Sequence, residues 1–237
     1  MSYLINELSV FFPAYNEEGN IKKTVEDARK TLLKIAKKWE IIIVNDGSKD
    51  NTLEISEKLS NADKRIKLIN QANKGYGGAV KTGLYDCQYD WLAFTDSDGQ
   101  FDFSEITNFI EEQKITKADL VIGYYKKRQV SKFKIWTSKL WEVAVFVLFG
   151  LHVTDIDCGF KFINKKVIDK IPTLESERGA FISSEFLIKS KRSGFKIVEI
   201  PVTHYPRTKG AGTGRDINVI IKSFIDLGRL WIKLNLG

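Results

Sequence analysis

The chain has 237 residues, of which 43% are hydrophobic and 28% are charged, enough for one large globular domain with a buried core. Residues 1–120 carry 20 acidic and 16 basic side chains, whereas residues 121–237 carry 10 and 21, so the second half is strongly basic. A basic half suits a phosphate-rich partner, but nothing beyond this balance favours nucleic acid, which we do not expect as a partner.

Cysteine usage and the apolar segments indicate a cytoplasmic protein. Cys87 and Cys158 are too few for a disulfide framework, which favours a reducing compartment. The first residues lack the basic segment and cleavage site of a signal peptide. The longest apolar run, Val143–Leu151, is about half the length that spans a bilayer, so we expect no membrane-spanning helix.

The first half alternates short apolar runs with helical stretches, which predicts an α/β fold with a mainly parallel sheet. The predicted strands are Leu8–Phe12, Glu40–Val44, Ile66–Ile69, Trp91–Thr95 and Leu120–Gly123. The predicted helices are 21–38, Thr52–Leu59, Gly78–Tyr85 and Phe103–Gln113.

Two longer amphipathic helices are predicted in the second half, at Lys132–Leu151 and Ile217–Leu236. Each combines an apolar stripe and a tryptophan, Trp136 or Trp231, with lysines, a composition typical of segments that lie on a membrane surface. Packing of these helices on the core or on a partner subunit is the alternative.

Polar and acidic turns follow three of the predicted strands, namely Pro13–Glu17, Asn45–Ser48 and Asp96–Gln100. The carboxyl ends of parallel strands meet at one edge of a sheet, where such folds bind ligands. Asp, Asn, Gly and Ser are also ordinary turn residues, but three acidic turns at one edge favour a site.

The segment Asp96–Gln100 predicts a divalent-cation site. Two carboxylates two residues apart can converge on one cation, and Gln100 adds a neutral oxygen, a donor set that suits Mg²⁺ or Mn²⁺. The chain has too few histidines and cysteines for zinc, and an EF-hand counted from Asp96 would place Thr107 where a glutamate is needed. The P-loop and dinucleotide-binding signatures are absent.

These segments, in this order, resemble family 2 glycosyltransferases of the GT-A fold. The matching elements are 12–18 (FPAYNEE), 44–48 (VNDGS), 73–75 (NKG), 96–100 (DSDGQ) and 153–161 (VTDIDCGFK), with Glu185 in a later helix. The last element is similar to one in the branch that glycosylates dolichyl or polyprenyl phosphate. The resemblance implies a GT-A domain over 1–215 with an amphipathic helix inserted at 131–152, followed by a C-terminal amphipathic helix at 216–237.

The resemblance also implies roles for individual residues. Asp98 and Gln100 would hold Mg²⁺ or Mn²⁺, and Asp98 and Asp155 would be catalytic, with Asp155 near the sugar and the acceptor. The residues implied to bind the nucleotide-sugar are Pro13, Tyr15, Glu17, Val44, Asp46, Lys74, Asp96, Ser97, Arg207, Lys209 and Arg215. Where the family often has an arginine after the fifth strand, this chain has Tyr124 and Tyr125, and the charge moves to Lys126, Lys127 and Arg128.

The activity implied is inverting, metal-dependent transfer of a hexose from GDP-mannose or UDP-glucose to a polyprenyl or dolichyl phosphate. The protein would be peripheral on the cytoplasmic face of a membrane, as a homo-oligomer or with a membrane-anchored partner. Transfer to a glycan or a soluble acceptor is the first alternative, and a non-catalytic nucleotide-sugar-binding module is the second. A nucleotidyltransferase is disfavoured because the first turn is acidic rather than rich in glycine and lysine.

Overall fold

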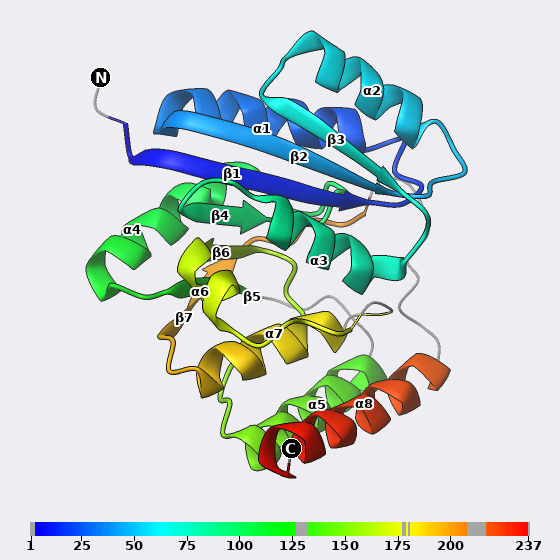
Figure 1. The fold of residues 1–237 in the computed structure, drawn as a ribbon, viewed down its shortest axis with the longest axis vertical. Coiled ribbons are helices and arrows are strands. Elements are labelled where there is room, and N and C mark those ends of the chain that lie inside the picture. Colours follow the sequence, from blue (N-terminus) through cyan, green and yellow to red (C-terminus); the bar gives the residue numbers. More distant parts are fainter. Residues whose placement is uncertain (1–2, 127–131, 177–178, 180, 208–216, 237) are drawn as a thin grey trace.

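A seven-stranded sheet forms the centre of the protein (Figure 1). The computed structural model describes residues 3–126, 132–176, 179, 181–207 and 217–236. The strands run in the order β3-β2-β1-β4-β6-β5-β7, and all neighbours pair in parallel except β6, which is antiparallel to β4 and β5. This sheet confirms the predicted α/β class. The strands are β1 (Ile5–Ala14), β2 (Ala36–Asp46), β3 (Ile66–Gln71), β4 (Trp91–Phe94), β5 (Leu120–Tyr125), β6 (Lys161–Asn164) and β7 (Ile197–Val202).

Helices cover both faces of the sheet, so its central strands are apolar on both sides. In β1, Phe11 belongs to the core on one face and its neighbours Val10 and Phe12 to the core on the other. One face packs against α1 (Ile21–Ile35), α2 (Thr52–Ala62) and, after a 3-10 turn at Phe103–Glu105, α4 (Ile106–Thr116). The other packs against α3 (Gly75–Asp86), α6 (Lys165–Lys170) and α7 (Phe181–Arg192).

The remaining helices, α5 (Lys132–Phe149) and α8 (Ile217–Leu236), lie side by side beyond α7 (Figure 1). Val145, Leu227 and Leu230 anchor the pair in the core. Their outer surface is apolar and exposed, with Val143 57% and Val147 72% exposed. The other exposed apolar side chains of the pair are Leu140, Phe146, Leu148, Ile225, Trp231, Ile232 and Leu236. Trp136 lies in the part of α5 whose side chains are not described.

Within the described part of the chain, no helix combines the length and apolarity that crossing a membrane requires.

Several predicted boundaries were wrong. The first helix ends at Ile35 rather than at Lys38, because residues from Ala36 onward pair with β1, with Ala36 opposite Ile5. The helix predicted over Phe103–Gln113 is a 3-10 turn followed by α4. Helix α5 ends at Phe149, not at Leu151, since Gly150 takes a left-handed φ of 65° that ends the helix. The bounds of α8 are confirmed, and the division into segments 1–215 and 216–237 stays a prediction.

Candidate active site

The polar turns after β1, β2 and β4 meet at one edge of the sheet, as the sequence predicts. β1 lies between the other two strands, with Pro13 opposite Val44 and Phe11 opposite Phe94. Pro13 and Val44 are buried, and Val44 pairs with strands on both sides, whereas Tyr15 is 40% exposed at the strand end. Ser97 is also buried, and its hydroxyl donates to the Pro13 carbonyl at 2.7 Å, which ties the end of β4 to β1.

Asp46 organises the loop that follows β3. Its carboxylate accepts hydrogen bonds from the Gln71 amide at 2.7 Å and the Lys74 backbone N–H at 2.9 Å. The adjacent Gly47 has a φ of 68°, and a Cβ there would meet the Asn73 nitrogen at 2.8 Å, so this turn requires glycine. Asp46 therefore holds in place the loop that carries Lys74, whose side chain is exposed.

Glu17 and Asp98 converge on Arg207, a residue distant in sequence. Glu17 is 7% exposed, accepts from the Asn20 amide at 2.7 Å and forms an ion pair with Arg207. The same guanidinium lies 3.6 Å from the Asp98 carboxylate. Burial raises the pKa of Glu17 above its usual value, despite the hydrogen bond from Asn20 and the charge of Arg207.

Asp96 is held between α3 and the loop after α5. Its carboxylate accepts a hydrogen bond from the Tyr76 hydroxyl at 2.9 Å. Gly159 lies so close that a Cβ on it would be 2.4 Å from the Asp96 Oδ2. Burial, followed by the charge of Asp98, raises the pKa of Asp96 to about 6. The carboxylate is thus fixed in position and sensitive to nearby charge.

Gln100 fastens the segment that carries Arg207 to the Asp98 turn. The Gln100 amide nitrogen donates to the Tyr205 carbonyl, and the Tyr205 N–H donates to the Gln100 carbonyl, both at 2.9 Å. The Asp98 carboxylate accepts from the Gln100 N–H at 3.1 Å. These bonds place two predicted metal ligands and one predicted phosphate-binding arginine in one cluster.

The donor set in this cluster fits a divalent cation that shares its shell with a ligand. In the described ranges, no group of three or more His, Cys, Asp or Glu side chains could hold a metal alone. Asp98 and Gln100 offer one carboxylate and one amide oxygen, and Mg²⁺ commonly binds one or two protein carboxylates together with substrate phosphates and water. The residues therefore suit a cation that arrives with a diphosphate.

Asp155 lies in a tightly held loop beside Asp96. It is 2% exposed, and its carboxylate accepts from the Asp157 N–H at 3.2 Å. The preceding Thr154 donates to Glu199 of β7 through its N–H at 2.7 Å and its hydroxyl at 3.1 Å. The loop that carries Asp155 is therefore anchored to the sheet.

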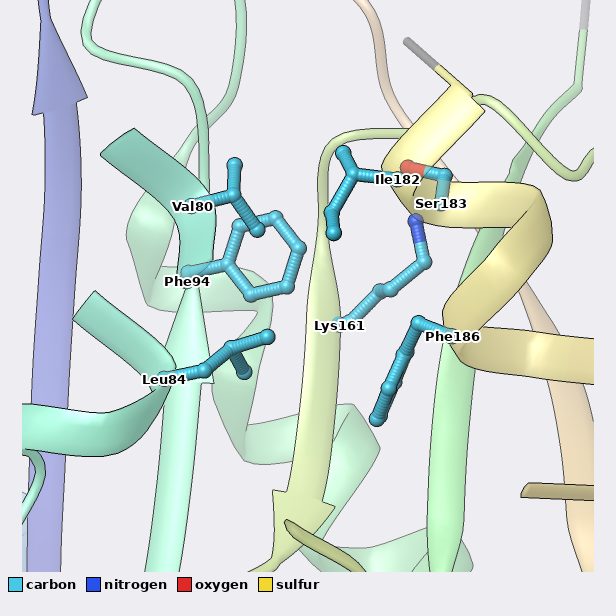
Figure 2. A pocket seen from close by; sticks show the side chains of 7 residues that line it. All are labelled: Val80, Leu84, Phe94, Lys161, Ile182, Ser183 and Phe186. Atoms are coloured by element: carbon cyan, nitrogen blue, oxygen red, sulfur yellow. The ribbon is translucent and has the colours of Figure 1, made fainter. Parts of the chain in front are cut away.

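Lys161 braces the same loop from inside the core. Its side chain is fully buried, and its ammonium donates to the carbonyls of Ile156, at 3.4 Å, and Cys158. Figure 2 shows this side chain pointing from β6 toward α7, among apolar side chains that include Phe94 and Phe186. Burial lowers the pKa of Lys161, against the effect of nearby acidic groups that include Asp157.

Glu185 has a structural position in α7. It is 2% exposed, pairs with Lys189 at 2.5 Å and accepts the N–H groups of Glu175 and Ser176 at 2.9 and 2.8 Å. Burial alone would raise the pKa of Glu185, but the hydrogen bonds from Lys189 and Ser176 lower it overall. Glu185 thus holds Glu175 and Ser176 against α7.

The structure does not describe two of the residues predicted to bind the nucleotide-sugar, Lys209 and Arg215. It also does not describe two of the basic residues after the fifth strand, Lys127 and Arg128. Two residues with clear contacts to the site, Tyr76 and Lys161, had no predicted role. Tyr76 lies in a glycine-rich segment, and this composition only weakly indicated that the segment approaches the site. Lys161 stands at the end of the matching 153–161 element, but its burial could not be inferred from its residue type.

Comparisons with known proteins place the chain among sugar transferases. The model of Glycosyl transferase family 2 matches residues 9–172. A dolichyl-phosphate beta-glucosyltransferase of Saccharomyces cerevisiae is 34% identical, over 83% of this chain and 66% of that protein. A protein of the same description from Trichomonas vaginalis is 30% identical, over 97% of this chain and 74% of its own length. The chain thus spans only about two thirds to three quarters of these relatives.

Among solved structures, glucosyl-3-phosphoglycerate synthase from Mycobacterium tuberculosis, in complex with Mn²⁺ and UDP-glucose, superposes with a TM-score of 0.70 at 16% identity. The match covers 96% of this chain and 78% of that one. At this identity the likeness shows the fold alone, and it confirms the predicted GT-A class.

Proposed function

Because the chain belongs to glycosyl transferase family 2, we propose that it transfers glucose from UDP-glucose to a polyprenyl or dolichyl phosphate, with inversion at the anomeric carbon. The observation that carries the proposal is the cluster of Asp98, Gln100 and Arg207 at the carboxyl edge of the sheet, beside Asp96. The description of the similar proteins favours glucose over mannose as the sugar, and thus UDP-glucose over GDP-mannose.

The donor's nucleoside is expected between the turns after β1 and β2. The exposed Tyr15 ring offers a stacking surface for the base, and the buried Pro13 forms the wall behind it. The loop ordered by Asp46 brings Lys74 to the same edge, where its exposed ammonium can reach a phosphate. Asp96 would face the ribose and the diphosphate.

The diphosphate is expected at Asp98, Gln100 and Arg207. Mg²⁺ or Mn²⁺ held by the oxygens of Asp98 and Gln100 would supply positive charge to the departing diphosphate. Arg207 already lies in this cluster, paired with Glu17 and 3.6 Å from Asp98, so its guanidinium is placed where a phosphate at Asp98 would meet it.

The transfer is a single displacement. An oxygen of the acceptor phosphate forms a bond to the anomeric carbon, and the bond from that carbon to the diphosphate oxygen breaks. The bonding electron pair leaves with the nucleoside diphosphate. The attacking oxygen is already anionic near neutral pH, so no side chain has to remove a proton. Asp155 would instead orient the sugar and favour the positive charge that develops on it, as its anchored loop permits.

The exposed apolar surface of α5 and α8 supports a peripheral position on a membrane. Val143 and Val147 of α5 and Ile232 of α8 are more than half exposed. Helix α8 also carries the exposed Trp231 and the exposed basic side chains of Arg229 and Lys233. Apolar, aromatic and basic side chains together suit the interface of an anionic bilayer. Flotation with vesicles of neutral and anionic lipids tests this, and dimerisation without vesicle binding would favour a homo-oligomer or a partner subunit instead.

A transfer assay tests the function itself. The purified chain is incubated with radiolabelled UDP-glucose or GDP-mannose, Mg²⁺ or Mn²⁺, and a polyprenyl phosphate, and label is counted in the organic phase. We expect transfer from UDP-glucose that Asp98→Asn abolishes. Label found only in a soluble phosphorylated or glycan product would support the first alternative. Donor binding without any transfer would support the non-catalytic module.

A further inference from the structure

A cavity of about 340 Å³ is lined in part by Asp155 and lies outside the cluster of Asp98, Gln100 and Arg207, the donor cluster. Its walls are Tyr125 at the end of β5, Lys139 and Glu142 of α5, and the segment from His152 to Asp155. A water molecule takes up about 30 Å³ in the liquid, so the cavity has room for roughly ten, enough for a phosphate group and the first atoms attached to it.

The cavity adjoins the donor cluster through packed aromatic rings. The Tyr125 ring lies 4.5 Å from the His204 ring and 6.1 Å from the Phe101 ring, measured between centroids. Phe101 directly follows Gln100, and His204 precedes Tyr205, which is bonded to Gln100. Asp155 therefore lines the cavity, and the Tyr125 ring connects the cavity to residues that adjoin Gln100 and Tyr205 in sequence.

The walls of the cavity combine basic and acidic side chains. Lys139 and His152 are both exposed, so an anion could reach the Lys139 ammonium and the His152 ring nitrogens. Asp155 and Glu142 also line the cavity, and Glu142 lies about one turn after Lys139 on α5. The Lys139 ammonium attracts an anion, and the exposed His152 ring can donate a hydrogen bond to it.

The rim of the cavity near His152 is apolar. The His152 ring packs edge-on against Phe146, with 5.8 Å between centroids, and Phe146 is 51% exposed on the outer surface of α5. Val143 and Val147 continue this apolar surface. A ligand with an anionic head and a hydrocarbon tail can therefore place its head in the cavity and its tail along α5.

From these contacts we infer that Lys139 and His152 bind the phosphate of the acceptor, a prenyl phosphate monoester, while its chain lies along Phe146 and the apolar surface of α5. The inference rests on the proposed function and adds to it the residues that recognise the acceptor. It assigns Asp155 the sugar side of the same cavity. Water-soluble phosphates share the anionic head but lack the tail that the apolar rim would bind.

Calorimetric titration tests the inference without requiring catalysis. The ligand is a short, water-soluble prenyl phosphate, compared with glycerol 3-phosphate and inorganic phosphate. Lys139→Gln and His152→Asn are each expected to weaken prenyl phosphate binding about tenfold or more, the value of one hydrogen bond to a charged group. Lys222→Gln, at an exposed lysine of α8 that does not line the cavity, is the matched control and should bind like the unmodified protein.

Steady-state kinetics with the same proteins provide a second readout. The two cavity variants should raise KM for the prenyl phosphate and leave KM for UDP-glucose unchanged. Prenyl phosphate binding in both variants equal to the Lys222→Gln control would overturn the inference. Equal binding of glycerol 3-phosphate and prenyl phosphate would overturn the inference that the hydrocarbon chain binds along the apolar surface of α5. If the unmodified protein binds prenyl phosphate through Lys139 but transfers no sugar to it, the proposed function fails and the binding site stands.

Discussion

Replacement of Gly159 by alanine tests how closely the Asp155 loop packs on Asp96. A Cβ at residue 159 would lie 2.4 Å from the Asp96 Oδ2 and 2.8 Å from its Cγ. Ordinary contacts begin at 3.4 Å, so one group must move by about 1 Å, and overpacking of this kind costs about 1–3 kcal/mol. The φ of Gly159 is not positive, so the cost is steric rather than conformational. We expect this loss in urea unfolding, together with lower transferase activity because Asp96 is displaced.

Two further variants isolate the cause. Gly228→Ala is the control without a clash, because a Cβ at this position of α8 would have no atom within 4 Å. It should stabilise the protein by about 0.5–1 kcal/mol, because alanine has the higher helix propensity. In an Asp96→Ala background the carboxylate is gone, so Gly159→Ala should cost at least about 1 kcal/mol less than in the native background. An equal cost in both backgrounds would refute the contact between Gly159 and Asp96.

Three other substitutions probe buried charge. Glu185→Ala leaves Lys189 buried and unpaired, and should lower the free energy of unfolding by about 3–5 kcal/mol in urea denaturation, whereas a loss below 1 kcal/mol would contradict the pairing. Because the pKa of Asp96 rises from 3.8 to about 6 on folding, stability should fall as pH rises through that window. When unfolding is measured in EDTA, the Asp96→Asn protein should lack this pH dependence. Its free energy of unfolding at pH 7 should exceed that of the unmodified protein by at most about 3 kcal/mol. Burial lowers the pKa of Lys161, so the free energy of unfolding should rise as the pH rises above this lowered pKa and level off near pH 10.5. Lys161→Met should abolish that rise. An unchanged alkaline profile would contradict the burial of its charge.

The sequence predicts well that the acidic turns meet at one edge of the sheet, because the signals for this are local. Apolar runs followed by acidic turns place Asp46, Asp96 and Asp98 at strand ends, and parallel pairing then brings those ends together. The 20-residue helix α8 is likewise predictable, since its apolar periodicity extends over its whole length.

Contacts that depend on tertiary packing were not predictable. The bond from Tyr76 to Asp96 requires α3 to lie against β4, and the burial of Lys161 depends on the antiparallel strand β6, whose four residues show no periodicity. The start of β2 at Ala36 was missed because pairing with β1 outweighs the helical pattern that continues to Lys38. The Lys139–His152 cavity is likewise visible only once α5 is placed over the end of β5.

Asp98 is expected to couple the binding of a divalent cation to that of a nucleoside diphosphate at the edge of the sheet, and thermal unfolding measures this coupling. With UDP at about 100 times its dissociation constant, binding stabilises the folded state by about 2.7 kcal/mol, which raises Tm by about 5–10 °C for a chain of this length. We predict this rise with UDP and Mn²⁺ or Mg²⁺ together, no comparable rise with either alone, and its loss in Asp98→Asn. An equal rise in Asp98→Asn, or no response to UDP or GDP with either metal, would contradict this role of Asp98.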